Sequence, residues 1–272
     1  YAPGMTTTTS SRPAPESRPP FGSQLRDFRQ RRGMSQLDLA HAAGVSPRHV
    51  SFVESGRSRP SSEMVLRLAE TLDVPLRSRN DLLHLAGYAP AYPERRLEEP
   101  ELSAISSIVD QMLRQHEPFP AFVLDRHWNV VRTNETAERL FSAVLPERPF
   151  NAVALFFHPG PCRELVENWE DVAWVTLARL RREVATAGDD ERLRRLLTEA
   201  EEAMADREKP SEVDPRAPTV TTRLRLGGET VETISTIVSF NAARDVTLDE
   251  LRVELVYPAD ERAEAEFRRL AG

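Results

Sequence analysis

The spacing of apolar residues along the first part of the chain predicts a series of short amphipathic helices. From Gly22 onward, apolar residues recur at three- and four-residue intervals, the period of a helix with one buried face. Serines stand where the middle helices begin, and glycines follow several of them, as expected of helix caps. The predicted helices cover about 25–33, 35–43, 46–54, 61–72 and 78–85.

The second and third of these helices are joined by a very short turn. Gly44 can adopt the positive φ that such a turn requires, and Ser46 can cap the helix that follows it. The residues expected to be buried in this pair are Leu37, Leu39, Ala40, Ala43, Val50 and Val53.

Beyond residue 100 the pattern changes from helices alone to a mixture of helices and strands. A helical repeat from Leu102 to Leu113 is followed by strand, tight turn, strand and short helix within 121–141. Two longer helices and three strands complete the pattern, at 165–184, 193–204, 220–226, 231–240 and 251–257. In the last strand Leu251, Val253, Leu255 and Tyr257 should point inward, and Arg252 and Glu254 outward.

These patterns predict two domains. Residues 22–89 form an all-helical domain, 90–100 a proline-containing linker, and 101–272 a domain of strands and helices. Residues 1–21 are rich in Thr, Ser and Pro and are expected to be a disordered tail. Tyr1–Gly4 precede Met5, so we interpret them as a vector-derived remnant.

Charge and composition separate the two domains further. The net charge is −7, but residues 1–92 hold 12 Arg against 8 acidic residues, so only this part favours a polyanion. The one cysteine, Cys162, excludes an internal disulfide and is typical of the reducing cytoplasm. No apolar run approaches the length of a membrane span, so no transmembrane helix is expected.

A helix, a turn at Gly44 and a capped second helix together have the geometry of a helix-turn-helix. With Val50 and Val53 holding the second helix to the core, its outer face carries polar and aromatic side chains. In DNA-binding proteins of this geometry, that face enters the major groove.

The segment SQLDLAHAAGVSPRHVSFVESGRSRPS, residues 35–61, resembles the XRE, or phage-repressor, family of DNA-binding domains. The resemblance implies a phosphate contact from Gln36, base contacts from the outer face of the third helix, and backbone contacts from the arginines after it. The implied DNA-binding residues are Gln36, Ser46, Arg48, His49, Ser51, Phe52, Arg57 and Arg59. Pro47 departs from the polar residue usual there, and a repressor-like domain can also serve as a protein contact.

The segment FVLDRHWNVVRTNETAERLF, residues 122–141, resembles the entry to a PAS-type sensor domain. With LHLAGYAP before it and WEDVAWVTLARLRREVA after it, the order of motifs is similar to the MmyB-like family of bacterial regulators. The resemblance implies a five-stranded antiparallel sheet covered by helices, with an apolar cavity suited to a fatty acid or similar lipid. The residues expected to line it are Phe122, Trp128, Phe141, Phe156, Trp169, Ala173, Val238 and Phe240.

Other interpretations of these residues remain open. Large apolar side chains also form ordinary cores, and Arg179 could either neutralise a ligand carboxylate or lie on an exposed helix face. His158, Cys162 and Glu164 lie near one another in sequence, but nothing supplies a third group to orient a nucleophile. The scattered histidines predict no metal site, and no glycine-rich phosphate loop is present, so no catalysis and no cofactor are expected.

The sequence therefore predicts a cytoplasmic bacterial transcription regulator. One recognition helix reads only a few base pairs, so a homodimer on a palindromic site in double-stranded DNA is expected. A small apolar ligand, with a fatty acid as the favoured class, would bind the second domain. Two alternatives stay open: a ligand-free DNA-binding protein whose second domain dimerises or recruits a partner, and an enzyme with a DNA-binding head.

Overall fold

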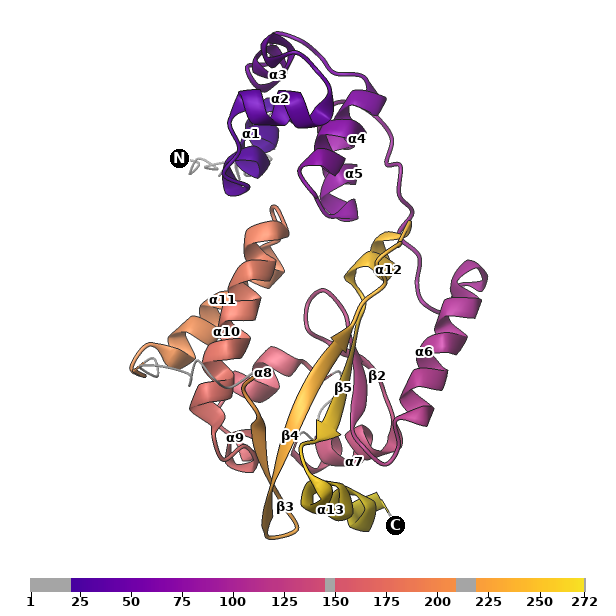
Figure 1. Ribbon diagram of the computed structural model, residues 1–272, viewed down its shortest axis with the longest axis vertical. Coiled ribbons are helices and arrows are strands. Elements are labelled where there is room, and N and C mark those ends of the chain that lie inside the picture. The colour runs from indigo at the N-terminus through magenta and orange to yellow at the C-terminus, as the bar shows by residue number, and fades with distance from the viewer. Residues whose placement is uncertain (1–20, 145–149, 209–218, 272) are drawn as a thin grey trace, which may run out of the picture. The chain divides into compact units, whose positions relative to one another are not determined.

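The computed structural model describes residues 21–144, 150–208 and 219–271 (Figure 1). The described chain forms two compact units, one of residues up to Val74 with Arg79–Pro90, the other of Pro75–Ser78 with the chain from Ala91 onward. The tail expected to be disordered lies, but for Phe21, outside the described residues.

The first unit is built from helices, as predicted. They are α1 (Phe21–Arg31), α2 (Gln36–Ala43), α3 (Pro47–Glu54), α4 (Ser62–Thr71) and α5 (Leu76–Leu85), whose first residues group with the second unit. Apolar side chains from all five helices meet in one core, among them Leu25, Leu39, Val50, Leu68 and Leu82, each with no exposed surface.

Short-range capping fixes where α2 and α3 begin and end. The Ser35 hydroxyl accepts a bond from the Asp38 amide, and the Asp38 carboxylate accepts one from the Ser35 amide, which is a complete capping box. Gly44 ends α2 with a φ of 66°, a left-handed conformation that favours glycine. Ser46 then caps α3 by accepting a bond from the His49 amide. These caps confirm the predicted helix, turn and helix.

A buried ion pair joins α1 to α3. The Arg29 guanidinium donates to both carboxylate oxygens of Glu54, at 2.6 and 2.9 Å, and the Glu54 side chain is completely buried. The Gln36 amide donates to the same carboxylate at 2.8 Å, which brings α2 into the cluster. Burial alone would raise the pKa of Glu54, but the bonds from Arg29 and Gln36 outweigh it and hold that pKa below its ordinary value.

Close approach of the backbones also constrains this unit. A Cβ added at Gly22 would lie 2.3 Å from the carbonyl oxygen of Glu54, so α1 can meet the end of α3 only with glycine at this position. The prediction that Leu37 is buried was wrong, since 53% of its surface is exposed. Leu37 and Leu39 are two residues apart and therefore point about 160° apart around the helix, and the core lies on the Leu39 side.

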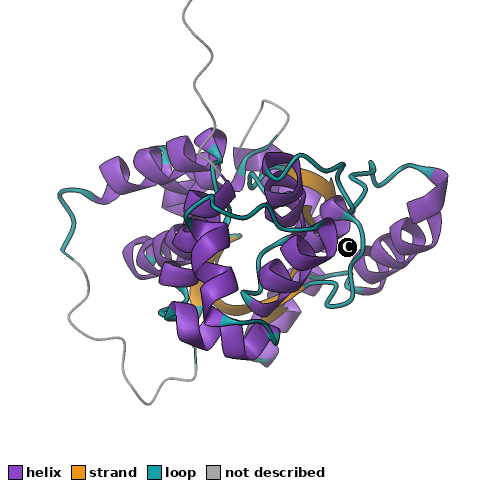
Figure 2. Cartoon of the chain, turned by 90° about the horizontal axis from the view of Figure 1, so that it is seen from above, coloured by secondary structure: helices purple, strands orange, loops and turns teal. Residues whose placement is uncertain are grey.

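The second unit contains a five-stranded antiparallel sheet in the order β2-β1-β5-β4-β3. The strands are β1 (Ala121–Leu124), β2 (Val130–Thr133), β3 (Thr222–Leu226), β4 (Glu229–Val238) and β5 (Arg252–Pro258). The helices are η1 (Pro100–Leu102), α6 (Ser103–Gln115), α7 (Glu135–Val144), α8 (Ala152–Phe157), α9 (Pro161–Leu165), α10 (Trp169–Thr186), α11 (Glu191–Met204), α12 (Val246–Glu250) and α13 (Glu261–Ala271). Figure 2 distinguishes these strands and helices by colour. An antiparallel sheet with helices confirms the predicted fold class.

Helices cover both faces of this sheet. One face carries Val123 and Val253, which pack with Val109 and Leu113 of α6. The other face, which we call the α10 face, packs against α8, α10 and α11. The largest buried cluster of the unit lies there and contains Leu124, Trp128, Val153, Phe157, Val166, Trp169, Ala173, Leu177, Leu180, Leu193, Leu196, Ala200 and Met204.

Two predictions about β5 were wrong. Arg252 and Glu254 were expected to face solvent, yet α10 lies against them, and their side chains are only 24% and 13% exposed. Arg179 of α10 donates to Glu254, so the helix and the strand are joined by charged groups. Tyr257, expected to point inward, is 41% exposed and packs edge-on against the ring of His116, with ring centroids 4.6 Å apart.

Replacing Arg29 by methionine should lower the free energy of unfolding of the first unit by about 3 kcal/mol, because the buried Glu54 carboxylate would keep only the Gln36 amide and the half-exposed Arg26, 3.4 Å away. The matched change Arg67→Met removes the exposed pair with Glu63 and should cost at most about 0.5 kcal/mol. Hydrogen exchange of the α2 and α3 amides in the full chain measures both effects. Equal losses would show that burial does not distinguish the two pairs.

Because the folded pKa of Glu54 is lowered, its stabilising contribution is present above the pH at which an unfolded glutamate titrates, about 4.3. The contribution is lost as the pH falls through the lower folded pKa.

Candidate DNA-contact face and ligand-binding core

The exposed side of α3 presents two arginines around one aromatic ring. The guanidinium carbons of Arg48 and Arg57 lie 5.1 and 5.8 Å from the centre of the Phe52 ring. Both arginines are exposed, and neither forms an ion pair with a residue in the part of the chain that the structure describes. We call Arg48, Phe52 and Arg57 the α3 face.

The α3 face is positively charged because the helix has no exposed acid. Its one acidic residue, Glu54, is buried and neutralised by Arg29. Free guanidinium groups bind phosphate oxygens, and they can also donate in pairs to the edge of guanine. The Phe52 ring offers an apolar contact of the kind that a thymine methyl group makes.

The other predicted DNA-contact residues lie in three different settings. Ser46 is exposed and uses its hydroxyl to cap α3, while His49 and Ser51 are half-buried on the same helix. Gln36 stands at the start of α2, with its amide held by Glu54. Arg59 is turned away, since its guanidinium donates to the Ala86 carbonyl after α5 at 3.0 Å. The structure therefore groups Arg48 with Arg57, but not with Arg59.

Six of the eight predicted ligand-binding residues lie on the α10 side of the sheet. The ring centroids of Phe122 and Phe141 are 5.1 Å apart, and those of Phe141 and Phe150 are 5.8 Å apart. A second pair, Phe156 and Trp169, stacks with centroids 6.3 Å apart. The three phenylalanines Phe122, Phe141 and Phe156 are half-buried, so their rings are not wholly enclosed by the surrounding protein.

The remaining three of these six are part of the buried core. Trp128, Trp169 and Ala173 are at most 5% exposed. Both indole groups already donate a hydrogen bond, Trp128 to Glu183 and Trp169 to the Phe156 carbonyl, each at 2.7 Å. Their polar atoms are therefore satisfied by the protein, and they would offer a ligand only apolar surface.

Val238 and Phe240 are not brought together with the other six, because they pack into the α6 cluster. Val238 pairs with Val253, so the two side chains share the face of the sheet that packs on α6, which we call the α6 face. Ile237, one residue earlier, pairs with Glu254 on the α10 face and is 48% exposed. Sequence reasoning missed Ile237, because it selected large residues of β4 without knowing the register.

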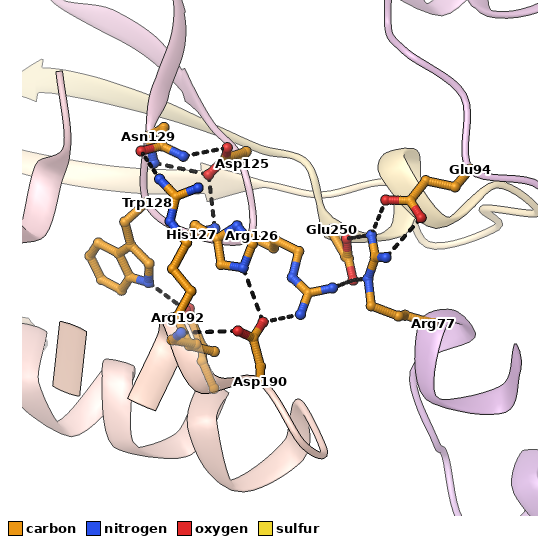
Figure 3. A network of polar contacts seen from close by, with 12 residues as sticks. Arg77, Glu94, Asp125, Arg126, His127, Trp128, Asn129, Asp190, Arg192 and Glu250 are labelled. Carbon is orange, nitrogen blue, oxygen red and sulfur yellow. Dashed lines mark hydrogen bonds and ion pairs between the residues drawn. The ribbon is translucent and has the colours of Figure 1, made fainter. Parts of the chain in front are cut away.

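A polar network holds the turn between β1 and β2 (Figure 3). The Asp125 carboxylate accepts bonds from the His127 and Asn129 amides, and Arg126 forms an ion pair with Asp190 of the loop before α11. Trp128 within this turn has a φ of 64°, which is unusual for a residue with a side chain. The network thus fixes Trp128 at one end of the buried cluster.

The same network extends to Glu250 at the end of α12. Its carboxylate accepts bonds from Arg77, at 2.8 and 2.9 Å, and lies 3.4 Å from Arg126. Arg77 belongs to the segment Pro75–Ser78 of the second unit, and it also forms an ion pair with Glu94. Arg77, Arg126, Glu94 and Glu250 thus each have an opposite charge beside them (Figure 3).

The region around Cys162 lacks the features of a nucleophilic centre. Burial raises the pKa of the Cys162 thiol to about 11, which disfavours the reactive thiolate. His158 is largely exposed, and its nearest acidic partner is Glu199, at 3.9 Å.

The described residues contain neither a candidate metal cluster nor a helix that could span a membrane. Within 21–144, 150–208 and 219–271, no three His, Cys, Asp or Glu side chains are grouped so that they could hold a metal ion. Over the same ranges, no helix combines the length and the apolar character that crossing a membrane requires.

Two models of known protein families match this chain. A family model described as "Helix-turn-helix" matches residues 25–78, and one described as "MmyB-like transcription regulator ligand binding domain" matches residues 105–270. These two matches define the class, which is a helix-turn-helix domain joined to a ligand-binding domain of transcription regulators. Since the second match covers more than half of the chain, the chain belongs to the MmyB-like transcription regulators.

Similarity to individual proteins is concentrated in part of the chain. The HTH-type transcriptional regulator RghRB of Bacillus subtilis is 36% identical over 83 residues, which are 30% of this chain and 58% of the relative. The HTH-type transcriptional repressor RghR of the same organism is 36% identical over 77 residues, which are 28% of this chain and 55% of the relative. The chain thus spans little more than half the length of these relatives.

Arg48→Ala should weaken binding to the preferred DNA sequence at least about tenfold more than binding to random duplex, because the family resemblance implies a base contact for Arg48. Arg57→Ala should weaken both equally and reduce the salt slope by about one, as expected for a phosphate contact. Binding to a duplex selected from a random library measures both changes, with Arg67→Ala of α4 as a control. Equal losses on the two duplexes would remove Arg48 from base recognition.

Proposed function

We propose that this regulator acts in the bacterial cytoplasm, binds a palindromic operator in double-stranded DNA as a homodimer, and responds to a small apolar ligand of the fatty-acid class. In this proposal the second unit is a PAS-like sensor, and the α3 face of each protomer reads one half-site. Ligand binding would alter the separation of the two DNA-binding units. Such an effect requires different ligand affinities in the DNA-competent and DNA-incompetent states.

The observation that carries the DNA-binding part of the proposal is the α3 face itself. Arg48 of α3 and Arg57 just after the helix are both exposed, without acidic partners among the described residues. A single helix of this kind contacts only a few base pairs, so two copies related by a two-fold axis would multiply the sequence readout. Light scattering of the operator complex should give two chains per duplex, and one chain per duplex would contradict the homodimer.

The half-buried aromatic side chains on the α10 face support the ligand part of the proposal. Phe122, Phe141 and Phe156 stand beside a large apolar cluster, and each retains some exposed surface. Ile237 adds further exposed apolar surface to the same face of the sheet. A hydrocarbon chain bound there would remove this surface from water, which is the main driving force for binding apolar ligands.

The ligand is tested by extracting freshly purified full-length protein with organic solvent and analysing the extract by mass spectrometry. We expect a near-stoichiometric fatty acid from the wild type and a loss of roughly threefold or more from Phe156→Ala, because about 1.5–3 kcal/mol of apolar contact is removed. Phe240→Ala is the matched control, since Phe240 is also half-buried but packs on the α6 face. That variant should retain the lipid.

Two results would contradict this part of the proposal. If the extract contains no lipid and added fatty acid does not bind, the second unit is better explained as a dimerisation or recruitment module. If Phe240→Ala loses as much lipid as Phe156→Ala, the ligand does not occupy the α10 face. A change in circular dichroism in either variant would identify a folding defect rather than a lost contact.

A further inference from the structure

A hollow of about 400 Å³ lies beside the start of α10, on the second unit. The segment before the helix runs along β3, since Val166 forms an antiparallel bridge with Leu224 and the Glu167 amide donates to the Arg223 carbonyl at 2.8 Å. Three arginines border the hollow, Arg163 of α9 and Arg223 and Arg225 of β3. None of them was among the predicted site residues.

Two guanidinium nitrogens at this hollow are buried without a hydrogen-bond acceptor. Within the described chain, Nη2 of Arg163 and Nε of Arg223 have no hydrogen-bond partner. The Arg163 guanidinium lies over the Trp169 ring, with its carbon 3.5 Å from the ring centre, so an aromatic contact holds it in place. Buried charged donors are normally paired, and an oxygen of a bound molecule would satisfy them.

The acidic residues around the hollow only partly balance these arginines. Glu167 accepts a bond from Thr230 and lies 3.6 Å from Arg223, while Glu170 forms an ion pair with Arg207. Asp171 also borders the hollow and is exposed. Arg163 and Arg225 still have no ion-pair partner among the described residues.

The environment of Arg163 adds to this imbalance. Burial and the nearby charge of Arg207 lower the pKa of Arg163, and the charge of Glu170 offsets this only in part. The backbone amides at the start of α10 contribute in the same direction, and Glu170 and Asp171 of the first turn partly offset them. Asn168 precedes this 18-residue helix, but its side chain bonds to β3 instead of capping the helix. The positive end of the helix dipole therefore faces this region without a side-chain cap.

A second hollow of about 400 Å³, beside His127, provides a useful contrast. The arginines that border it include Arg95, Arg126 and Arg132, and these are paired with Asp245, Asp190 and Asp110. A ligand anion would have to displace an existing partner there, whereas at α10 it would meet Arg163 and Arg225, which have no ion-pair partner among the described residues.

We propose that the hollow bordered by Arg163, Arg223 and Arg225, which we call the α10 anion site, binds a carboxylate or phosphate group of a small molecule. Trp169 connects the site to the apolar core, because Arg163 lies on its ring and Phe156 stacks with it. The group can come from the apolar ligand or from a free anion. The first source rests on the function proposed above, and the second does not.

The site is tested by calorimetric titration of the full chain with sodium phosphate, with sodium chloride at the same ionic strength as the blank. Phosphate should bind the wild type at millimolar concentration or tighter, and Arg163→Gln should weaken binding at least tenfold. Arg225→Gln, a change at an exposed position, gives the same test with little risk to folding. Arg195→Gln on the exposed side of α11 is the matched control and should bind as the wild type does.

Titration with dodecanoate and dodecanol, which differ only in the head group, identifies the source of the anion. If the apolar ligand supplies it, dodecanoate binds at least tenfold tighter than dodecanol, and Arg163→Gln removes the difference. If phosphate binds and dodecanoate shows no such preference, the site holds a free anion. Failure of both dodecanoate and dodecanol to bind argues against the apolar ligand alone, and the phosphate titration still decides the anion site.

The proposal of the α10 anion site is contradicted if Arg163→Gln and Arg225→Gln bind phosphate and dodecanoate as the wild type does. It is also overturned if phosphate does not bind and dodecanoate binds no tighter than dodecanol.

Discussion

The pairing of Arg29 with Glu54 is the constraint on which the DNA-binding unit depends. It closes the contact between α1 and α3, and Gln36 extends it to α2, so three helices share one buried carboxylate. The pair also determines the charge of the outer surface. Because the acid of α3 is turned inward and neutralised, Arg48 and Arg57 are left as the dominant charges on the exposed side. The packing of the three helices and the positive charge of the exposed side therefore both depend on Glu54.

The second unit uses different interactions on the two faces of its sheet. The α6 face is held by aliphatic side chains such as Val123 and Val253. On the α10 face, a large apolar cluster is combined with charged contacts, among them Arg179 with Glu254. Apolar contacts tolerate small shifts between layers, whereas charged groups must meet at defined positions. We infer that these pairs fix the position of α10 over the sheet and leave the aromatic groups beside it partly uncovered.

The sequence was sufficient where structure depends on neighbouring residues. The caps at Ser35 and Ser46 and the turn at Gly44 are local, and the predicted helix-turn-helix is confirmed. Long-range pairing was harder, since the register of β4 separates Val238 from Ile237 and the covering helix makes Arg252 and Glu254 interior. Helix α13 was not predicted, although Ala263 and Phe267 have helical spacing. The arginines of the α10 anion site come together only through the bridge between the segment before α10 and β3.

The position of the tryptophans has a consequence for spectroscopy. All three, Trp128, Trp169 and Trp174, belong to or pack against the apolar cluster on the α10 face. The DNA-binding unit contains none, so selectively excited indole emission from the intact chain arises from the ligand-binding unit. The tryptophans are therefore an intrinsic fluorescence probe of the ligand-binding unit. A change in that emission upon addition of operator DNA would be direct evidence of communication between the two units, without any attached label.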